Sequence, residues 1–478
     1  MKIKLLIAAI ITSSLITGCT KQLEVQPVSE ITNAIYWKAE GDVTGYLTGI
    51  YSDFRGLMNS TYFFEDRGDA FIPGLEGSAS EAYEQNLNNL NAPLWTNHYN
   101  LVHHTNLILK YGPGIAFGDQ NKKNRTLAEA QTLRAYLYFL LVKAWGKVPL
   151  ILEPTESDNV PFPARASEAE VLSLVLDDLE KALALFPDAS YPNKGRISKN
   201  VAQAIKADVL LWRAKVYNGG DGDLTNALGA VDAAMTGLSI QTNFQDVFAT
   251  DKKKNAEISW ALHFQRDERS DQYGSRLKPR DIFVSGATNK DLLAFAKNGA
   301  RSVYSPSPKI EAAFAANDKR KAWSVIRALD LNGATIGVFD NKFRGTAHTD
   351  DRYYDNDIVM YRLGELLLTK AEILAALRRP EEAITELEKV RNRAGTGVYT
   401  GLRTKEAVER EIFDERFREL FFELKRWTDI VRFHYGGTID AYTEVPKLVG
   451  KTIPLFFPIR KTQIDLNPKL EQTEGYNN

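Results

Sequence analysis

Cysteine is nearly absent from this chain: Cys19 is the only one in 478 residues. No disulfide can form within the chain, so the fold must be stabilised by burying apolar surface. An excess of charge of one sign is also missing, because 60 lysine and arginine side chains face 61 aspartate and glutamate side chains. Without a strong net field, we expect no nucleic-acid partner and no binding to anionic lipid through charge.

Catalytic motifs are missing as well. The sequence has no Gly-x-Ser-x-Gly elbow, no Gly-x-x-x-x-Gly-Lys phosphate loop, no His-Glu-x-x-His motif and no Asp-x-Asp-x-Asp-Gly calcium loop. His98, His103 and His104 are close in sequence, but on a helix they point in different directions, so we expect no metal site. These absences favour a binding protein without a cofactor. A glycan-degrading carboxylate pair is an alternative, because such a pair is defined by distance in space.

Long apolar runs are confined to the N-terminal segment, which has the pattern of a bacterial lipoprotein signal. Two lysines precede an apolar run from Leu5 to Ile11, and the segment closes with Ile16-Thr17-Gly18-Cys19. The run is too short to span a bilayer core of about 30 Å. We therefore predict a signal peptide at residues 1–18, a membrane anchor through lipid on Cys19, and a mature domain at 19–478. A short core helix that happens to end in cysteine is the alternative.

Most of the mature chain has helical periodicity. Apolar side chains recur every three to four residues in seven segments. These segments are 43–57, 94–109, 127–145, 171–186, 201–217, 358–390 and 406–431. Strand-like runs are few, and the best of them are 258–264 and 281–284. The sequence therefore predicts a mainly α-helical fold with a few short strands.

Small residues within these segments indicate repeated helix pairs. Ala371 and Ala383 are twelve residues apart, and the stretch 379–382 fits the turn between two helices. Similar pairs are predicted within 204–234 and 129–186. Small residues let two helices approach closely, so each pair would bury its faces by stacking on its neighbours. Ordinary helical hairpins explain the spacing equally well.

Three long segments have no regular period: 59–91, 267–307 and 331–357. Each contains glycine or proline together with scattered aromatic residues. Irregular segments of this length inside a compact domain usually carry function. We refer to them as the first, second and third insertions and expect them to hold the ligand.

The predicted helix 406–431 carries aromatic core residues together with closely spaced charges. Five charged residues lie three to four positions apart, where opposite charges can pair along a helix. They are Glu415, Arg418, Glu419, Glu423 and Arg426. A catalytic carboxylate cluster would use the same residue types. We favour structural ion pairs, because each acid has an arginine within reach and the helix is lined with core aromatics.

This helix resembles the C-terminal signature of the SusD/RagB family of outer-membrane nutrient-binding lipoproteins. The matching residues are Glu415-Arg416, Glu419-Leu420, Phe422-Glu423, Arg426-Trp427 and Asp429-Ile430. Further motifs follow in the family's order over nearly the whole chain, among them Gly49-Ile50-Tyr51, Trp95 with Tyr99 and Asn106, Leu133-Arg134-Ala135, Gly195-Arg196-Ile197-Ser198 and Phe457-Pro458-Ile459. Leu424 departs from the pattern, because a glycine is common there.

The resemblance implies a SusD-like fold of tetratricopeptide-like helix pairs, with irregular insertions on a ligand-binding face. It also implies a location on the outer membrane, at the cell surface, and a SusC-like TonB-dependent transporter as partner. The cargo in this family is most often a glycan, and its members bind without cutting. A peptide-binding uptake lipoprotein is the main alternative, and a glycan-degrading enzyme is less favoured.

Candidate ligand contacts come from aromatic and polar residues of the insertions. Sugar faces pack on aromatic rings, while sugar hydroxyls need planar donors and acceptors. We therefore predict contacts from Tyr62, Phe64, Arg67, Asp69 and Tyr83 in the first insertion and from Tyr273 and Tyr304 in the second. Packing of the insertion onto the helices is the competing interpretation for each ring.

Six tryptophans lie on periodic segments, and we assign them to the core. They are Trp37, Trp95, Trp145, Trp212, Trp260 and Trp427. The pattern around Trp323 does not decide between core and surface.

Overall fold

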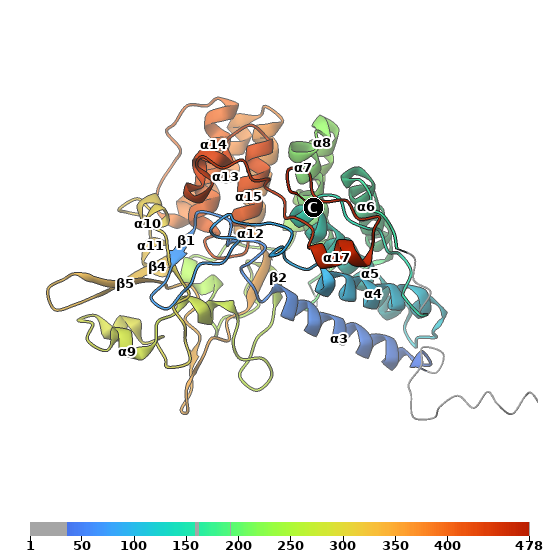
Figure 1. Cartoon of the computed structure of the whole chain (residues 1–478), viewed down its shortest axis with the longest axis horizontal. Helices are drawn as coiled ribbons and strands as arrows, with labels where there is room; N and C mark the ends of the chain where they lie inside the picture. Colours follow the sequence, from blue (N-terminus) through green and yellow to red (C-terminus); the bar gives the residue numbers. More distant parts are fainter. Residues whose placement is uncertain (1–35, 158–161, 192, 478) are drawn as a thin grey trace, which may run out of the picture.

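A computed structural model describes residues 36–157, 162–191 and 193–477 of the chain (Figure 1). The predicted signal peptide and Cys19 lie outside these residues. Within the described part, none of the helices is both long enough and apolar enough to span a bilayer.

Helices dominate the fold, as the periodicity predicts. The long helices are α3 (Glu40–Met58), α4 (Thr96–Tyr111), α5 (Gln120–Trp145), α6 (Glu168–Leu185), α7 (Lys199–Val216), α8 (Gly220–Met235), α12 (Leu363–Ala376), α13 (Pro380–Ala394), α14 (Lys405–Glu419) and α15 (Arg426–Tyr435). The short ones are η2 (Gly112–Gly114), η3 (Phe244–Val247), η4 (Tyr273–Leu277), α9 (Asp281–Val284), η5 (Lys290–Leu293), α10 (Pro308–Ala313), α11 (Lys321–Ser324), α16 (Ala441–Glu444), η6 (Pro446–Leu448) and α17 (Lys461–Leu466).

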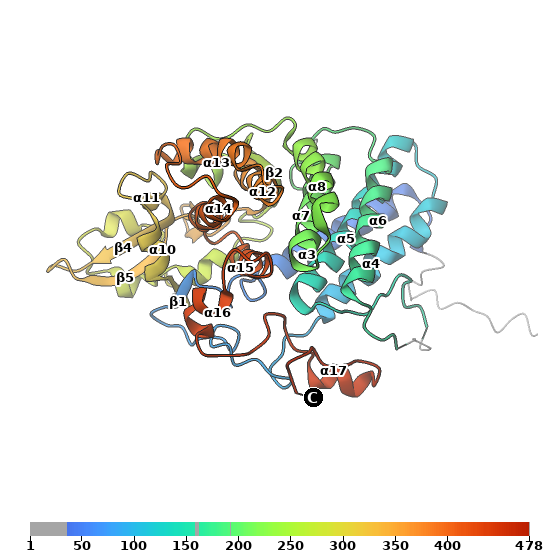
Figure 2. The same cartoon turned by 90° about the horizontal axis from the view of Figure 1, so that it is seen from above.

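The predicted helix pairs are present and stack on one another (Figure 2). Helix α5 packs on α6, α7 on α8, and α12 on α13. The pairs are joined in turn, because α6 contacts α7 and α8 contacts α12. Each pair therefore buries its faces on its neighbours, as the small residues predict.

Local signals explain where several helices begin and end. Helix α6 starts with a capping box, in which the Ser167 hydroxyl accepts from the Glu170 amide and the Glu170 carboxylate accepts from the Ser167 amide. Helix α13 has Pro380 in its first turn and ends at Gly395, whose φ of +78° closes the helix in the left-handed region.

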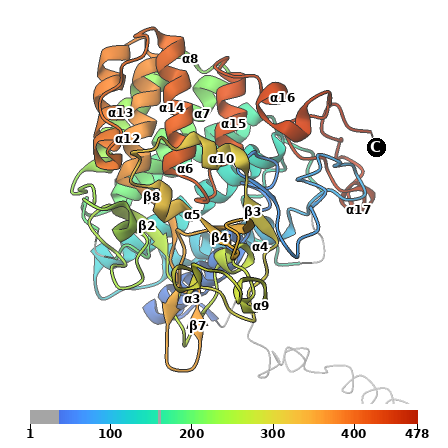
Figure 3. The ribbon, with the colours of Figure 1, turned by 90° about the vertical axis from the view of Figure 1, so that its left-hand side faces the viewer.

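The short strands form antiparallel pairs within the insertions or next to them. Strand β1 (Phe71–Pro73) pairs with β3 (Tyr304–Pro306), β2 (Ile258–Leu262) with β8 (Ile358–Arg362), β4 (Val325–Leu329) with β5 (Thr335–Asp340), and β6 (Thr346–Ala347) with β7 (Arg352–Tyr353). The β4–β5 hairpin and the β6–β7 hairpin both extend away from the helical scaffold (Figures 1 and 3). The β1–β3 pair joins the first insertion to the second.

All six tryptophans assigned to the core are buried. The ring of Trp260 stacks on Phe54 with centroids 5.6 Å apart and planes 7° from parallel. Trp323, which the sequence left undecided, keeps 38% of its surface exposed on α11.

Two short segments have a different secondary structure from the one predicted. Residues 281–284 form a single helical turn instead of a strand, because only Val284 is buried while Ile282 and Phe283 face solvent. Residues 358–362 form strand β8 instead of the start of a helix. All five residues are buried, so their backbone N–H and C=O groups cannot bond to water. Pairing with β2 gives these groups hydrogen-bond partners.

The predicted continuous helix 406–431 is also wrong. Helix α14 ends at Glu419 and α15 begins at Arg426. Between them Phe422 and Leu424 have φ angles of +59° and +60°, a left-handed conformation that costs a non-glycine residue about 1–2 kcal/mol. The φ of Leu424 is one that glycine adopts without strain. Both side chains are buried, which offsets the strain.

Candidate functional site

Arg67, a predicted ligand contact, is fully buried and holds the first insertion on the C-terminal segment. Its Nε donates to Gln85 Oε1 at 2.9 Å, and its two Nη atoms donate to the carbonyls of Leu455 at 2.6 Å and Pro454 at 2.8 Å. The guanidinium lies 4.5 Å from the ring centroid of Trp427. These contacts use the side chain for packing inside the protein.

Asp69 is engaged in the same way. Its carboxylate accepts from Arg426 at 2.6 and 2.8 Å and from Lys309 at 2.5 Å. Burial alone would raise the pKa of Asp69, but the charges and hydrogen bonds of Arg426 and Lys309 outweigh it and lower the pKa to about 2. Asp69 therefore stays ionised and ties the first insertion to α15.

The aromatic candidates are packed between the insertions and the scaffold. The Tyr304 hydroxyl donates to Asp66 at 2.7 Å, and the Tyr273 hydroxyl donates to the Phe422 carbonyl at 2.5 Å. Six of the seven predicted contacts are buried: Phe64, Arg67, Asp69, Tyr83, Tyr273 and Tyr304. Tyr62 is half-buried beside Phe457. This burial favours the competing interpretation, in which these residues fasten the insertions.

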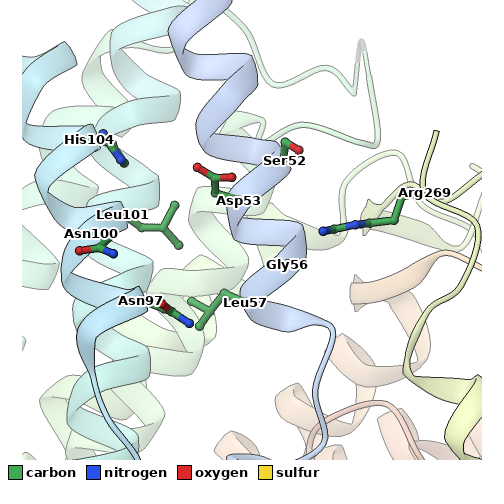
Figure 4. Close-up of a pocket in the computed structure, with 9 residues that line it drawn as sticks. All are labelled: Ser52, Asp53, Gly56, Leu57, Asn97, Asn100, Leu101, His104 and Arg269. Carbon is green, nitrogen blue, oxygen red and sulfur yellow. The ribbon is translucent and has the colours of Figure 1, made fainter.

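A cavity of about 300 Å³ lies between α3 and α4 (Figure 4). Asp53 from α3, His104 from α4 and Arg269 from the second insertion line it. His104 is committed through Nδ1 to the Tyr46 hydroxyl at 2.7 Å. Among the described residues that line this cavity there is no tryptophan, tyrosine or phenylalanine, so it offers no broad ring on which a sugar could stack.

A second cavity, of about 320 Å³, combines an exposed indole with planar polar side chains. We call it the Trp323 cavity. Its lining includes Gln245, Phe248, Asp251, Trp323, Asn341, Lys342, Arg344, Arg352 and Asn356. It brings together α11, the segment that follows η3, and the third insertion, which lie far apart in the sequence.

Two buried asparagines brace this cavity. Asn341 Nδ2 donates to the Ala322 carbonyl at 2.7 Å, and its Oδ1 accepts from Arg344, so it joins α11 to the third insertion. Asn356 Nδ2 donates to the Phe248 carbonyl at 2.9 Å, and its Oδ1 accepts from the Gly345 amide at 2.7 Å. The walls are therefore held by hydrogen bonds before any ligand arrives.

Lys342 connects the cavity to the buried scaffold. Its Nζ donates to the Phe421 carbonyl at 2.7 Å and to Glu423 at 2.8 Å, and it lies 4.7 Å from the ring centroid of Phe248. Burial lowers the pKa of Lys342, although the Glu423 carboxylate opposes the shift. The side chain is committed to the protein and serves as the floor of the cavity.

The sequence analysis named no residue that lines the Trp323 cavity as a ligand contact. It placed the ligand contacts on the first two insertions and named no residue of the third. The available signal was Trp323 itself, an aromatic residue outside the helical stripes and close to the third insertion. Within the described part of the chain, no cluster of three or more histidine, cysteine, aspartate or glutamate side chains could hold a metal ion.

Known proteins are similar to this chain in fold and in sequence. Residues 327–476 match the model of the SusD family, and residues 21–211 match the family model described as "Starch-binding associating with outer membrane". SusD-like protein P38 of Formosa agariphila is 26% identical over 515 residues, which cover 98% of this chain and 97% of that protein. Starch-binding protein SusD of Bacteroides thetaiotaomicron is 23% identical over 424 residues, which cover 74% of this chain and 73% of that protein.

A solved structure agrees over nearly the same length. B. fragilis NanU superimposes with a TM-score of 0.83 at 26% identity, covering 95% of this chain and 100% of that one. The mainly α fold and the family resemblance predicted from sequence are therefore confirmed. The two family models, the relatives that align from end to end and the shared architecture show that this chain belongs to the SusD/RagB family.

Proposed function

We propose that the protein captures an oligo- or polysaccharide at the outer-membrane surface and delivers it to a SusC-like TonB-dependent transporter. The observation that carries the proposal is the exposed ring of Trp323 on a cavity lined by amide and guanidinium groups. The family model described as starch-binding and the starch-binding SusD relative support a carbohydrate as the cargo.

The Trp323 cavity has the chemistry that a sugar needs. The indole offers a flat apolar face to the C–H groups of a sugar ring, and Gln245, Asp251 and the arginines offer planar partners for hydroxyls. One stacked ring contributes only about 0.5–1.5 kcal/mol if it behaves as an aromatic pair does. We therefore expect weak capture, with a Kd in the micromolar to millimolar range.

The remaining parts of the proposal follow from the N-terminal pattern and the family. Residues 1–18 are removed, Cys19 carries lipid, and 19–478 forms one SusD-like domain held at the outer membrane. The protein binds its cargo and does not cut it. The transporter completes uptake.

Binding is tested with the chain from Thr20 onward, which keeps every described residue. Calorimetry against a panel of oligosaccharides should find a glycan that binds in the micromolar to millimolar range and whose affinity falls about two- to tenfold in Trp323→Ala. Leu331→Ala is the matched control, because Leu331 is 88% exposed on the β4–β5 turn and away from the cavity lining. Its affinity should equal that of the unaltered protein.

Other outcomes would replace the proposal. Binding of peptides in place of glycans would support a peptide-uptake lipoprotein, and release of reducing ends by the purified protein would establish an enzyme. The partner is tested by isolating the complete lipoprotein from its native membrane. A complex without a TonB-dependent transporter would contradict delivery.

A further inference from the structure

The Trp323 cavity contains two arginines that form no ion pair with a carboxylate of the described chain. Arg344 and Arg352 both line it. Among the described residues, neither guanidinium forms an ion pair with an aspartate or glutamate. The ion pairs that surround the cavity join other residues: Lys342 with Glu423 at 2.8 Å, and Lys278 with Asp340 at 2.5 Å.

Both guanidiniums keep hydrogen-bond donors to spare. Arg344 donates to the Asn341 side chain and to the Leu292 carbonyl at 3.2 Å. Arg352 donates through Nη1 to the carbonyls of Arg344 at 2.9 Å and Gly345 at 3.2 Å. A guanidinium carries five N–H donors, and Nε of either arginine and Nη2 of Arg352 bond to no other residue of the described chain. Those donors are free for a ligand.

The electrostatics of the cavity favour an anion. Burial and the neighbouring charge of Arg352 lower the pKa of Arg344, against a smaller opposing effect of Asp340. The acid that lines the cavity, Asp251, is exposed at its surface. A second positive charge held beside the first, with one solvated carboxylate nearby, leaves the site short of negative charge.

We propose that the cargo is an acidic glycan whose carboxylate or sulfate group binds Arg344 and Arg352 while a sugar ring packs on Trp323. This inference rests on the proposed function and names its substrate class. Guanidinium groups bind such anions through two parallel N–H···O bonds, and a planar carboxylate matches that fork best. A uronic-acid oligosaccharide is therefore the favoured ligand, and a sulfated one shares the same chemistry.

The test compares charged and neutral forms of the same sugar. Oligogalacturonate is measured against its methyl ester, and a sulfated galactan oligosaccharide against its desulfated form, all by calorimetry with the chain from Thr20 onward. One charged form should bind at least about tenfold more tightly than its neutral counterpart. The pair that shows this difference identifies the bound group as a carboxylate or as a sulfate. Its affinity should fall as salt rises, while that of a neutral glycan should not.

Substitutions then assign the effect to the two arginines. Arg344→Gln and Arg352→Gln should each weaken the charged ligand about tenfold or more and weaken its neutral counterpart by a smaller factor. Arg378→Gln is the control, because this exposed arginine lies outside the cavity lining and pairs with Asp221 at 3.4 Å. The salt dependence of binding by the unaltered protein tests the acidic cargo without any substitution. The proposal can therefore still be contradicted if an arginine variant fails to fold.

The two proposals can fail separately. Equal affinity for charged and neutral forms, with a loss in Trp323→Ala and none in the arginine variants, would overturn the acidic cargo and keep glycan capture. No binding of either form of any sugar would overturn both.

Discussion

Arginine has opposite roles in two neighbouring regions of the molecule. In the buried ion-pair network, Arg320, Arg362 and Arg393 are almost fully hidden from solvent and surrounded by Glu257, Asp318, Glu415, Glu419 and Glu423. In the Trp323 cavity, Arg344 and Arg352 form no ion pair with any acid of the described chain. Charge is therefore balanced in the scaffold, and we propose that the unpaired arginines of the cavity bind the ligand.

Glu419 is the centre of the buried ion-pair network. Its carboxylate accepts from Arg320 at 2.9 Å, from Arg362 at 2.5 Å and from Arg393. Burial would raise the pKa of Glu419, but the three guanidiniums outweigh it and hold that pKa well below its usual range. One acid at the end of α14 thereby joins β8, α13 and the turn before α11.

The largest effect is expected from breaking this network. Glu419→Gln should lower the free energy of unfolding by about 3–5 kcal/mol, because it leaves three buried guanidiniums without a shared counter-charge. Chemical denaturation followed by circular dichroism measures the change. Glu381→Gln is the control, since this acid lies on the exposed face of α13, and its loss should cost less than about 0.5 kcal/mol.

The pH dependence of the same contribution has a definite sign. Because the folded pKa of Glu419 is depressed, its stabilisation is complete above the unfolded pKa of about 4.3 and is lost as the pH falls. The stability difference between Glu419→Gln and the unaltered protein should therefore shrink in acid. A difference that stayed constant from pH 7 to pH 3 would contradict the role of the charge.

A second prediction concerns a buried acid that lacks the arginines of the network. Glu65 accepts from the Lys425 amide at 3.1 Å through Oε1, while its Oε2 has no hydrogen-bond partner in the described chain. Burial raises the pKa of Glu65 to about 8. The folded state therefore keeps a proton that the unfolded state releases, and stability falls as the pH rises from about 4.5 to 8.

Glu65→Gln should remove this loss. Relative to the unaltered protein, the variant should gain about 3 kcal/mol between pH 5 and pH 8, measured as the difference in the free energy of unfolding at each pH. Glu381→Gln again provides the control and should show no such gain. A gain in acid in place of alkali would mean that Glu65 is ionised in the folded state.

The smallest effect is expected in the cavity. Arg352→Gln should change the free energy of unfolding by about 1 kcal/mol or less, because the arginine donates two hydrogen bonds to carbonyls and balances no buried acid. Arg362→Gln, its counterpart in the buried network, should cost about 3–5 kcal/mol. A similar loss in the free energy of unfolding for both variants would contradict the distinction between the arginines of the buried network and those of the cavity.

The scaffold was accessible from sequence because its signals are local. Apolar spacing located the long helices, small residues located the stacked pairs, and the tryptophans on those segments are buried as predicted. The prediction of one helix over 406–431 was wrong because the apolar pattern continues across the break between α14 and α15. The spacing of apolar residues does not reveal the left-handed backbone at Phe422 and Leu424. That conformation depends on how the two side chains pack in the folded protein.

The sequence predicted that these charges form ion pairs, but it placed most of the partners on the same helix. Arg418 and Glu415 do pair three positions apart. Arg426 instead binds Asp69 from the first insertion, and Glu419 binds arginines from three other elements. Spacing along one helix cannot reveal partners that are brought in by the rest of the fold.

The sequence by itself determined the family, the helical scaffold and its core, since each is encoded in periodic patterns and ordered motifs along the chain. Only the tertiary structure decided which arginines are paired with acids and where the Trp323 cavity lies. Phe248, Trp323 and Arg352 meet across about a hundred residues of sequence, because hydrogen bonds from Asn341 and Asn356 draw three separate segments together. Contacts between distant segments produce no periodic pattern in the sequence, so the sequence alone does not predict them.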